Sequence, residues 1–236
     1  GDRSVVFLPR HGRGHRLMPS ELNFRANMYG FKKLGVEWVI SISAVGSMRE
    51  QIRPLDLVIP GQFFDWTRRR VSSFFGNGIV AHVGMADPVC PDLADRLEEA
   101  ARATGATVHR GGTYLCIEGP QFSSKGESKI YRQWGVDVIG MTNMPEAKLA
   151  REAELCYATL ALVTDYDVWH ESEAHVTVEA VVANLMKNVA TAKEVLRRVV
   201  PRVGPPRRCP CPFLLKSAVI TNPAAFSSRT RKALDL

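Results

Sequence analysis

The sequence predicts an α/β protein in which helices flank a central mixed β-sheet. Short apolar runs alternate along the chain with stretches whose apolar residues recur at helical spacing, and this alternation is typical of a sheet covered by helices. The length of 236 residues and the hydrophobic content of 45% suit one large α/β domain with a sizeable core.

The expected strands are apolar runs that end at turn or polar residues. The clearest is Ala-Thr-Leu-Ala-Leu-Val (158–163), whose residues are all apolar or β-branched, as in a buried parallel strand. We expect strands at residues 4–9, 38–44, 56–60, 113–117, 136–141 and 157–164, with a further candidate at 217–221.

The expected helices are amphipathic stretches with recognisable ends. Ser20 is placed to cap the first, Gly105 to stop the second, and Pro145 lies in the first turn of the fourth. The last is the clearest, because its apolar residues recur every three or four positions until Pro201. We expect helices at residues 20–34, 92–104, 124–134, 145–154 and 177–200.

Composition limits the function classes. No apolar run approaches the roughly 18 residues that span a membrane, and the first residues lack the apolar region of a signal peptide, so we expect a cytoplasmic protein. The net charge of +7 admits nucleic-acid binding. However, the basic stretches at 68–70 and 197–208 lack the interleaved aromatic residues of single-strand binders. A basic pocket for a small anion explains the charge equally well.

The five cysteines are scattered and include no C-x-x-C pair. We therefore expect neither a disulfide framework nor a zinc site. Cys209 and Cys211 could form a redox-sensitive pair, and reduced thiols in a loop are the simpler interpretation.

Two carboxylates follow the clearest strand directly, in Thr-Asp-Tyr-Asp (164–167). In open α/β sheets ligands bind outside the carboxyl ends of strands, so Asp165 and Asp167 are candidates for binding an amine or a ring nitrogen. An acidic turn that caps the next helix is the alternative.

Other strand ends carry groups that suit an oxyanion. Arg10 and His11 follow the first strand, Ser43 and Ala44 the second, and Met141 and Thr142 the fifth. An arginine, hydroxyls and backbone amides together suit phosphate. The chain has no G-x-x-x-x-G-K-[ST] and no G-x-G-x-x-G motif, which argues against ATP and NAD.

Six motifs resemble those of the trimeric purine nucleoside phosphorylases, in particular their 5'-methylthioadenosine phosphorylase branch. They occur in the family's order between about residues 3 and 200. They are Arg-His-Gly-Arg-Gly-His-Arg-Leu-Met-Pro-Ser (10–20), Ser-Ala-Val-Gly-Ser-Met-Arg (43–49), Met-Ala-Asp-Pro-Val-Cys-Pro (85–91), Ile-Glu-Gly-Pro-Gln-Phe-Ser-Ser (117–124), Met-Thr-Asn-Met-Pro-Glu (141–146) and Thr-Asp-Tyr-Asp-Val-Trp (164–169).

The resemblance implies a three-layer nucleoside phosphorylase-like domain over residues 1–204, which 205–236 continue as a tail. It also implies phosphorolysis of 5'-methylthioadenosine to adenine and 5-methylthioribose 1-phosphate by a cytoplasmic homotrimer. Inorganic phosphate would be a co-substrate, with no cofactor and no metal, and the partners would be small molecules, not nucleic acid or membrane.

The resemblance also assigns roles to individual residues. Arg10, His11, Ser43, Thr142 and the backbone of Ala44 would hold phosphate. Met141 would lie against the ribose and Phe122 beside the purine or sugar. Val178, Val181 and Val182 would surround the methylthio group, although plain packing of the helix also explains these valines. His82 would reach the site of a neighbouring subunit; a surface histidine without that role is the alternative.

Asp165 would act at purine N7 and the 6-amino group, with Asp167 beside it. In this family aspartate at that position goes with 6-aminopurines and asparagine with 6-oxopurines. Ser43 stands where threonine is common.

The start of the chain differs from the family's pattern. The family's first strand and its Gly-Gly-[Ser/Thr]-Gly phosphate loop have no counterpart here. We therefore keep open a catalytically impaired member that binds nucleosides. A 6-oxopurine nucleoside phosphorylase is the other alternative.

Overall fold

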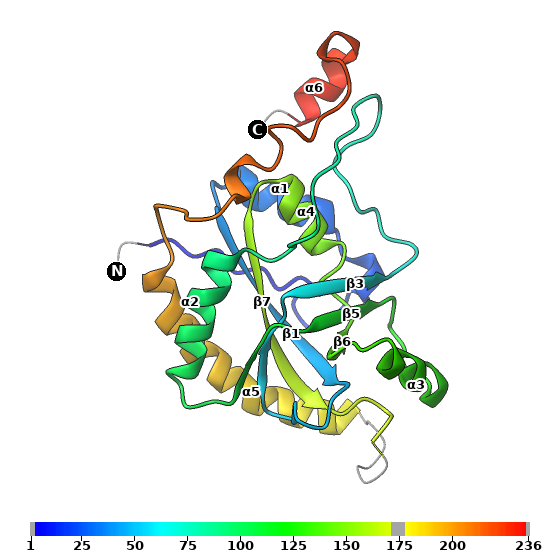
Figure 1. Ribbon diagram of the computed structural model, residues 1–236, viewed down its shortest axis with the longest axis vertical. Coiled ribbons are helices and arrows are strands. Elements are labelled where there is room, and N and C mark those ends of the chain that lie inside the picture. The colour runs from blue at the N-terminus through cyan, green and yellow to red at the C-terminus, as the bar shows by residue number, and fades with distance from the viewer. Residues whose placement is uncertain (1–2, 171–177, 235–236) are drawn as a thin grey trace.

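The computed structural model describes residues 3–170 and 178–234, which form a mixed sheet between two layers of helices (Figure 1). Within these residues the sheet has seven strands in the order β3-β5-β6-β1-β7-β2-β4. The strands are β1 (Trp38–Ser47), β2 (Leu57–Ile59), β3 (Gln62–Trp66), β4 (Val108–Arg110), β5 (Thr113–Ile117), β6 (Val138–Gly140) and β7 (Cys156–Asp165).

The sheet contains both parallel and antiparallel pairs, as the sequence predicts. β1 and β7 form its centre as a long parallel pair, and β6 and β2 flank this pair in antiparallel orientation. The remaining neighbours, β3–β5, β5–β6 and β2–β4, are parallel.

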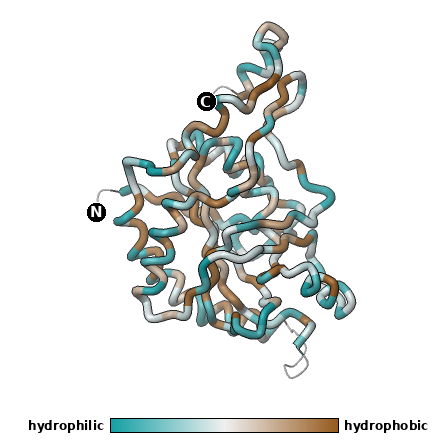
Figure 2. The backbone as a smooth tube through the Cα atoms, in the orientation of Figure 1, coloured by the Kyte–Doolittle hydropathy of each residue, from teal (hydrophilic) through white to brown (hydrophobic). Residues whose placement is uncertain are grey.

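The helices cover both faces of the sheet. α2 (Pro91–Arg102) and α5 (Val178–Val199) pack together on one face, and α1 (Phe24–Lys33) and α4 (Glu146–Glu152) lie together on the other. α3 (Lys125–Gln133) lies beside β5 and β6, and α6 (Ser228–Leu234) projects from the body of the molecule in the tail (Figure 1). Along α2 and α5, hydrophobic and hydrophilic residues alternate (Figure 2), as in amphipathic helices with one face on a core.

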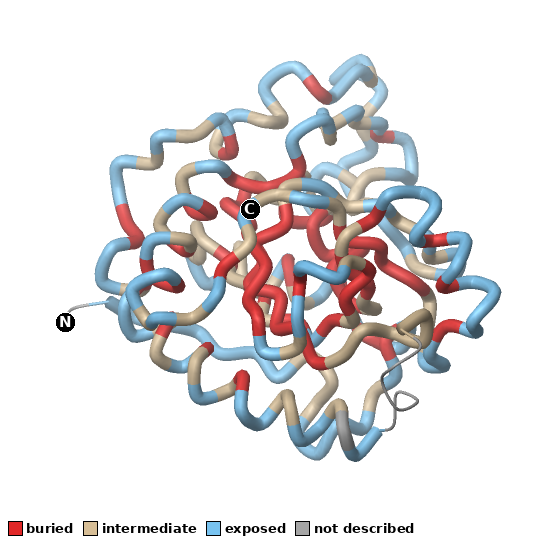
Figure 3. The backbone as a smooth tube through the Cα atoms, turned by 60° about the horizontal axis from the view of Figure 1, so that its bottom comes forward, coloured by how far each residue is buried: buried red, intermediate tan, exposed pale blue. Residues whose placement is uncertain are grey.

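β7 is the central strand of the core, because successive side chains of a strand point to opposite faces. Ala158, Leu160 and Leu162 pack with α2 and α5, and Tyr157 and Val163 pack with α1 and α4. Buried segments accordingly run through the middle of the molecule (Figure 3). The strand therefore places its last residue, Asp165, at the end of a rigid element.

Most predicted elements are confirmed, with ends that coincide or differ by at most three residues. The predicted strands at 38–44, 56–60, 113–117, 136–141 and 157–164 correspond to β1, β2, β5, β6 and β7. The predicted helices at 92–104, 124–134, 145–154 and 177–200 correspond to α2, α3, α4 and α5. Residue 177, where we expected α5 to begin, lies outside the described residues.

Three predictions of secondary structure are wrong. Residues 4–9 are extended but pair with no strand among the described residues. The apolar run there therefore remains at the surface, where Phe7 is 76% exposed. The candidate strand at 217–221 reduces to one isolated bridge between Ala81 and Val219.

The first helix begins later than predicted. A short 3₁₀ turn, Pro19–Glu21, precedes α1, and the backbone is extended at Leu22. Ser20 therefore caps no helix; its hydroxyl bonds to the Glu118 carboxylate instead.

Three elements, β3, β4 and α6, were not predicted from the sequence; they are short or lie in the tail. No described helix has both the length and the apolar composition needed to cross a membrane.

Candidate active site

The candidate site lies where β1 and β7 end side by side. Because the two strands are parallel, their carboxyl ends meet at one edge, and Gly46 pairs there with Asp165 after a register shift next to Val45. A cavity of about 1230 Å³ opens at this edge and extends along β1 toward α5. It is lined by all the predicted site residues except one: Arg10, His11, Ser43, Ala44, Phe122, Met141, Thr142, Asp165, Asp167, Val178, Val181 and Val182.

Asp165 is held by hydrogen bonds from its own turn. Oδ2 accepts from the Thr164 hydroxyl at 2.6 Å, and Oδ1 accepts from the backbone N–H of Asp167 at 2.8 Å. Burial raises the pKa of Asp165 above its usual value, against these two hydrogen bonds, which lower it. The carboxyl group is therefore both fixed in place and more easily protonated than a surface aspartate.

Asp167, the second carboxyl group of this turn, lies beside Asp165. Burial raises its pKa to about 6, although the Ser128 hydroxyl donates to its carboxylate and opposes the shift. The residue adopts a φ of 53°, a left-handed conformation that aspartate tolerates better than most residues. Two carboxyl groups whose pKa values are raised by burial thus face one cavity, as acid–base chemistry requires.

Two hydroxyl groups meet on the neighbouring strands. β6 runs antiparallel to β1, so the residue two positions after β6, Thr142, lies beside Ser43. Their oxygens are 3.4 Å apart, and the Tyr114 hydroxyl lies 3.0 Å from Ser43 Oγ. This buried group of neutral donors can bind an anion.

Arg10 reaches the same region from the extended N-terminal segment. Its guanidinium donates to Glu146 at 2.7 Å, to Ser41 at 3.0 Å and to the carbonyl of Ile42 at 2.9 Å. Burial lowers the pKa of Arg10, but Glu146, Tyr157 and Tyr114 together outweigh it, so the net shift is upward and the positive charge is retained. Glu146 thus fixes the arginine at the floor of the cavity.

His11 is oriented by one hydrogen bond, between Nδ1 and the carbonyl of Leu17 at 2.9 Å. A carbonyl only accepts, so Nδ1 carries the proton. Burial lowers the pKa of His11, so the ring is neutral near pH 7 and Nε2 can accept a proton.

Apolar side chains form the opposite wall of the cavity. Val178, Val181 and Val182 come from the first turn and a half of α5, and Met141 and Phe122 line the same cavity. Val178 is 61% and Val182 48% exposed, so neither side chain is buried in a helix core.

The structure does not bring His82 into this cavity. The residue is exposed, and its backbone N–H bonds to the tail at Ala218. A role in the site of the same chain is therefore not supported.

Comparison with known proteins gives the family. A family model described as "Phosphorylase superfamily" matches residues 2–201. The chain belongs to this superfamily.

Relatives and solved structures of this superfamily cover nearly the whole chain. S-methyl-5'-thioadenosine phosphorylase of Geobacter sulfurreducens is 60% identical over 98% of this chain and 82% of its own length. The protein of the same description from Koribacter versatilis is 57% identical over 99% of this chain and 80% of its own length.

Two solved structures agree with the fold. A methylthioadenosine phosphorylase from an antarctic soil metagenomic library superposes with a TM-score of 0.91 at 51% identity, covering 97% of this chain and 82% of its own. The methylthioadenosine phosphorylase of Schistosoma mansoni in complex with adenine gives a TM-score of 0.80 at 38% identity, covering 83% of this chain and 75% of its own. The family and the three-layer phosphorylase fold expected from the motifs are confirmed.

Four residues of this phosphorylase site were not predicted from the sequence. Glu146 anchors Arg10, Tyr114 joins the hydroxyl group, Ser128 bonds Asp167, and Gly46 leaves room for Asp165. Glu146 is the last residue of one of the quoted motifs. A carboxylate in an apolar environment needs a cation, and this need was the signal that could have indicated a partner for Glu146. Nothing in the local sequence indicates the partners of the other three.

Four of the five cysteines lie close together in the fold. Cys90, Cys156, Cys209 and Cys211 converge, with sulfur atoms within 4.8 Å of one another, although they are scattered in sequence. Spacing along the chain therefore did not indicate how near these thiols lie to one another.

Proposed function

We propose that this phosphorylase converts 5'-methylthioadenosine and phosphate into adenine and 5-methylthioribose 1-phosphate. The observation that carries the proposal is the pairing of Asp165 and Asp167, with raised pKa values, opposite the hydroxyls of Ser43 and Thr142 in one cavity. The methylthioadenosine phosphorylases that are 51–60% identical to this chain support the proposal.

The reaction follows from the two ends of the cavity. A phosphate oxygen attacks C1' while the bond from C1' to purine N9 breaks, and the electron pair of that bond stays on the purine. Protonation of N7 makes the purine a neutral leaving group. We assign this proton to the Asp165 carboxyl group, whose burial favours its protonated form, with Asp167 beside it. After this proton transfer, the ionised Asp165 accepts a hydrogen bond from the 6-amino group of the purine, which favours adenine.

The phosphate end uses groups of different kinds. Ser43, Thr142 and the backbone of Ala44 would donate to phosphate oxygens, and Arg10 would supply positive charge near them. A neutral His11, with its proton on Nδ1, would accept from the O–H of monoprotonated phosphate. These assignments need no cofactor, and phosphate serves as a co-substrate.

The apolar wall selects the 5' substituent. Val178, Val181 and Val182 offer methyl groups but no hydrogen-bonding partner, so a methylthio group fits there and a 5'-hydroxyl would lose its bonds to water. An unpaired buried hydroxyl costs about 1–3 kcal/mol, which predicts a preference for methylthioadenosine over adenosine.

The proposed assembly is a homotrimer in which His82 serves the site of a neighbouring subunit. His82 is exposed and does not line the cavity of its own chain. Phe64, Trp66 and Trp134 form a partly exposed aromatic cluster at the edge strand β3, with ring centroids 5.3–6.0 Å apart. Exposed apolar clusters on edge strands suit subunit contacts.

The test is adenine release from methylthioadenosine with and without phosphate, compared with adenosine and inosine. We expect release only with phosphate, and methylthioadenosine as the best substrate. Adenine binding without turnover would instead support the nucleoside-binding alternative, and faster turnover of inosine the 6-oxopurine alternative. Light scattering should give three times the 26.2 kDa of one chain, and a monomeric mass would contradict the trimer.

A further inference from the structure

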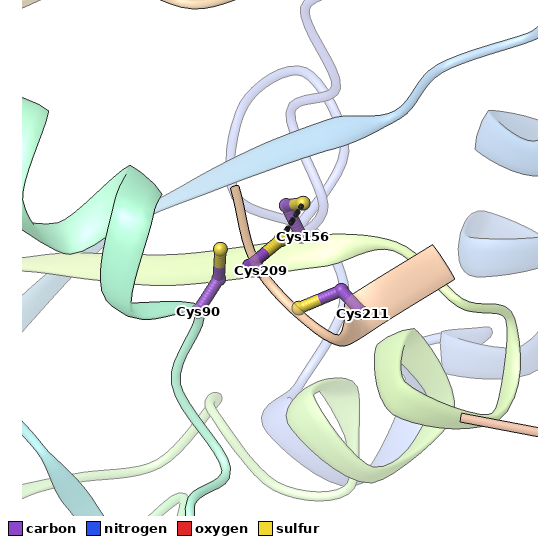
Figure 4. Close-up of side chains that lie close together, drawn as sticks. All are labelled: Cys90, Cys156, Cys209 and Cys211. Carbon is purple, nitrogen blue, oxygen red and sulfur yellow. Dashed lines mark hydrogen bonds between the residues drawn. The ribbon is translucent and has the colours of Figure 1, made fainter. Parts of the chain in front are cut away.

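Four cysteines from three separate segments meet on the face of the sheet covered by α2 (Figure 4). The sulfur atoms of Cys90, Cys156, Cys209 and Cys211 all lie within 4.8 Å of one another. The sulfurs of Cys156 and Cys209 are 3.4 Å apart. Cys209 is half-buried, and the other three are buried.

The backbone fixes this arrangement, so it does not depend on side-chain rotation alone. The N–H of Cys90, the N-cap of α2, donates to the carbonyl of Tyr157 at 2.8 Å, one residue after Cys156 at the start of β7. The segment with Cys209 and Cys211 is tied to Glu154, because Arg207 donates to its carbonyl and Leu215 to its carboxylate. The third segment is thereby held beside the other two.

We propose that these four cysteines bind one Zn²⁺ ion, a site separate from the phosphorylase cavity. A tetrahedral zinc ion with bonds of about 2.3 Å to sulfur sets the sulfurs about 3.8 Å apart. Shifts of less than about 1 Å would bring the observed cluster to that spacing. Four thiolates complete the usual coordination number and leave no position for a substrate, so the ion is structural.

The surroundings suit a thiolate cluster. The backbone N–H of Leu93 lies 3.5 Å from the sulfur of Cys90 and donates to it. Cys90 stands at the N-terminal end of α2, whose dipole favours negative charge. Arg208 immediately precedes Cys209 in the sequence and adds positive charge to the segment that carries two of the four ligands, whereas Arg207 is paired with Glu37 at 3.3 Å.

The position of the site indicates what the ion would do. Cys156 and Asp165 lie at opposite ends of β7, which at about 3.3 Å per residue places them roughly 30 Å apart. The ion would therefore not act in catalysis. It would fasten the chain after α5 to β7 and α2, with which Cys211 already packs.

The experiment measures metal in the full chain, expressed with zinc and purified without chelators. We expect one zinc per chain by mass spectrometry of the metal, and X-ray absorption showing four sulfur neighbours at about 2.3 Å. Replacement by Co²⁺ should give the intense thiolate-to-cobalt absorption of a tetrahedral site. These readouts do not depend on catalysis. Zinc binding can therefore be disproved while the proposed catalytic function holds, and the catalytic function can be disproved while zinc binding holds.

Cysteine variants test the ligand set. The variant with Cys209→Ser and Cys211→Ser should lower zinc affinity by at least about tenfold and lower the melting temperature in zinc-containing buffer. Cys116→Ser is the matched control, because Cys116 is buried outside the cluster and bonds Met144; it should keep the full zinc content.

Two results would overturn the proposal, and both can be read on the unaltered chain. One is a chain that remains without zinc after dialysis against an equimolar amount of Zn²⁺. The other is a decrease in the mass of the chain that shows disulfide bonds among the four cysteines, in metal-free protein that was purified under reducing conditions.

Discussion

A Cβ atom on Gly46 would lie 2.9 Å from Oδ1 of Asp165, closer than such atoms come in folded proteins. The two residues are register partners across β1 and β7, and Ile139 and Asp167 close the remaining space at 3.1 and 3.4 Å. The absence of a side chain at position 46 therefore sets the position of the carboxyl group that we assign to proton transfer.

Gly46→Ala should displace Asp165 and reduce kcat/KM for methylthioadenosine by about 10–100-fold, because displacements near 1 Å cost rates of this order. Steady-state adenine release measures the effect. Gly30→Ala is the control, since a Cβ in α1 at that position meets nothing within 4 Å. Equal activity of the two variants would show that the contact between Gly46 and Asp165 does not position the acid.

Glu146→Gln should destabilise the protein by about 3–5 kcal/mol, because the buried charge of Arg10 loses its counter-ion. The two side chains are only 13% and 5% exposed, and Glu146 also accepts from the Tyr157 hydroxyl. Unfolding in urea measures the loss. Glu194→Gln on α5, which breaks exposed pairs with Arg197 and Arg198, should cost no more than about 1 kcal/mol. A similar small loss at both positions would contradict a structural role for the buried pair.

Asp167→Asn should become more stable than the natural chain as pH rises. The pKa of Asp167 is raised from 3.8 to about 6 in the folded state, so between these values the unfolded chain binds fewer protons. The free energy of unfolding of the natural chain therefore falls with rising pH in that window, by up to about 3 kcal/mol at 1.36 kcal/mol per unit.

The measurement is urea unfolding of both proteins from about pH 4 to pH 7, the window set by this linkage. The stability difference in favour of Asp167→Asn should grow up to about pH 6 and then level off. The exposed Asp87→Asn controls for the loss of one negative charge. A difference that stays constant with pH would mean that burial does not shift Asp167.

Asp165→Asn should change which purine is preferred. The amide cannot supply the proton to N7, and its N–H group faces the 6-amino group where a carboxylate oxygen accepted before. One mismatched hydrogen bond costs about 1–3 kcal/mol, so kcat/KM for methylthioadenosine should fall by at least about tenfold, while the ratio of inosine to methylthioadenosine turnover rises. Asp167→Asn should leave that ratio unchanged. A reversal of these two outcomes would move the purine contact from Asp165 to Asp167.

Local sequence predicted the parts of the fold that depend on local physics. The unbroken apolar run of β7 predicted a buried strand, and the two carboxylates after it predicted a ligand site at its end. Ser124 caps α3 through a capping box with Glu127, and both partners lie within one turn. The apolar run at 4–9 failed as a strand, because a strand also needs a neighbour with free backbone groups, which local sequence does not specify.

The sequence by itself thus determined the family, the order of the main elements and part of the set of residues that line the cavity. Tertiary structure decided which groups touch. Arg10 meets Glu146, Gly46 meets Asp165, and Cys90 meets Cys156 across separations of many residues. Periodicity and caps are properties of neighbouring residues, whereas these contacts arise only when the register of β1, β7 and β6 brings distant segments together.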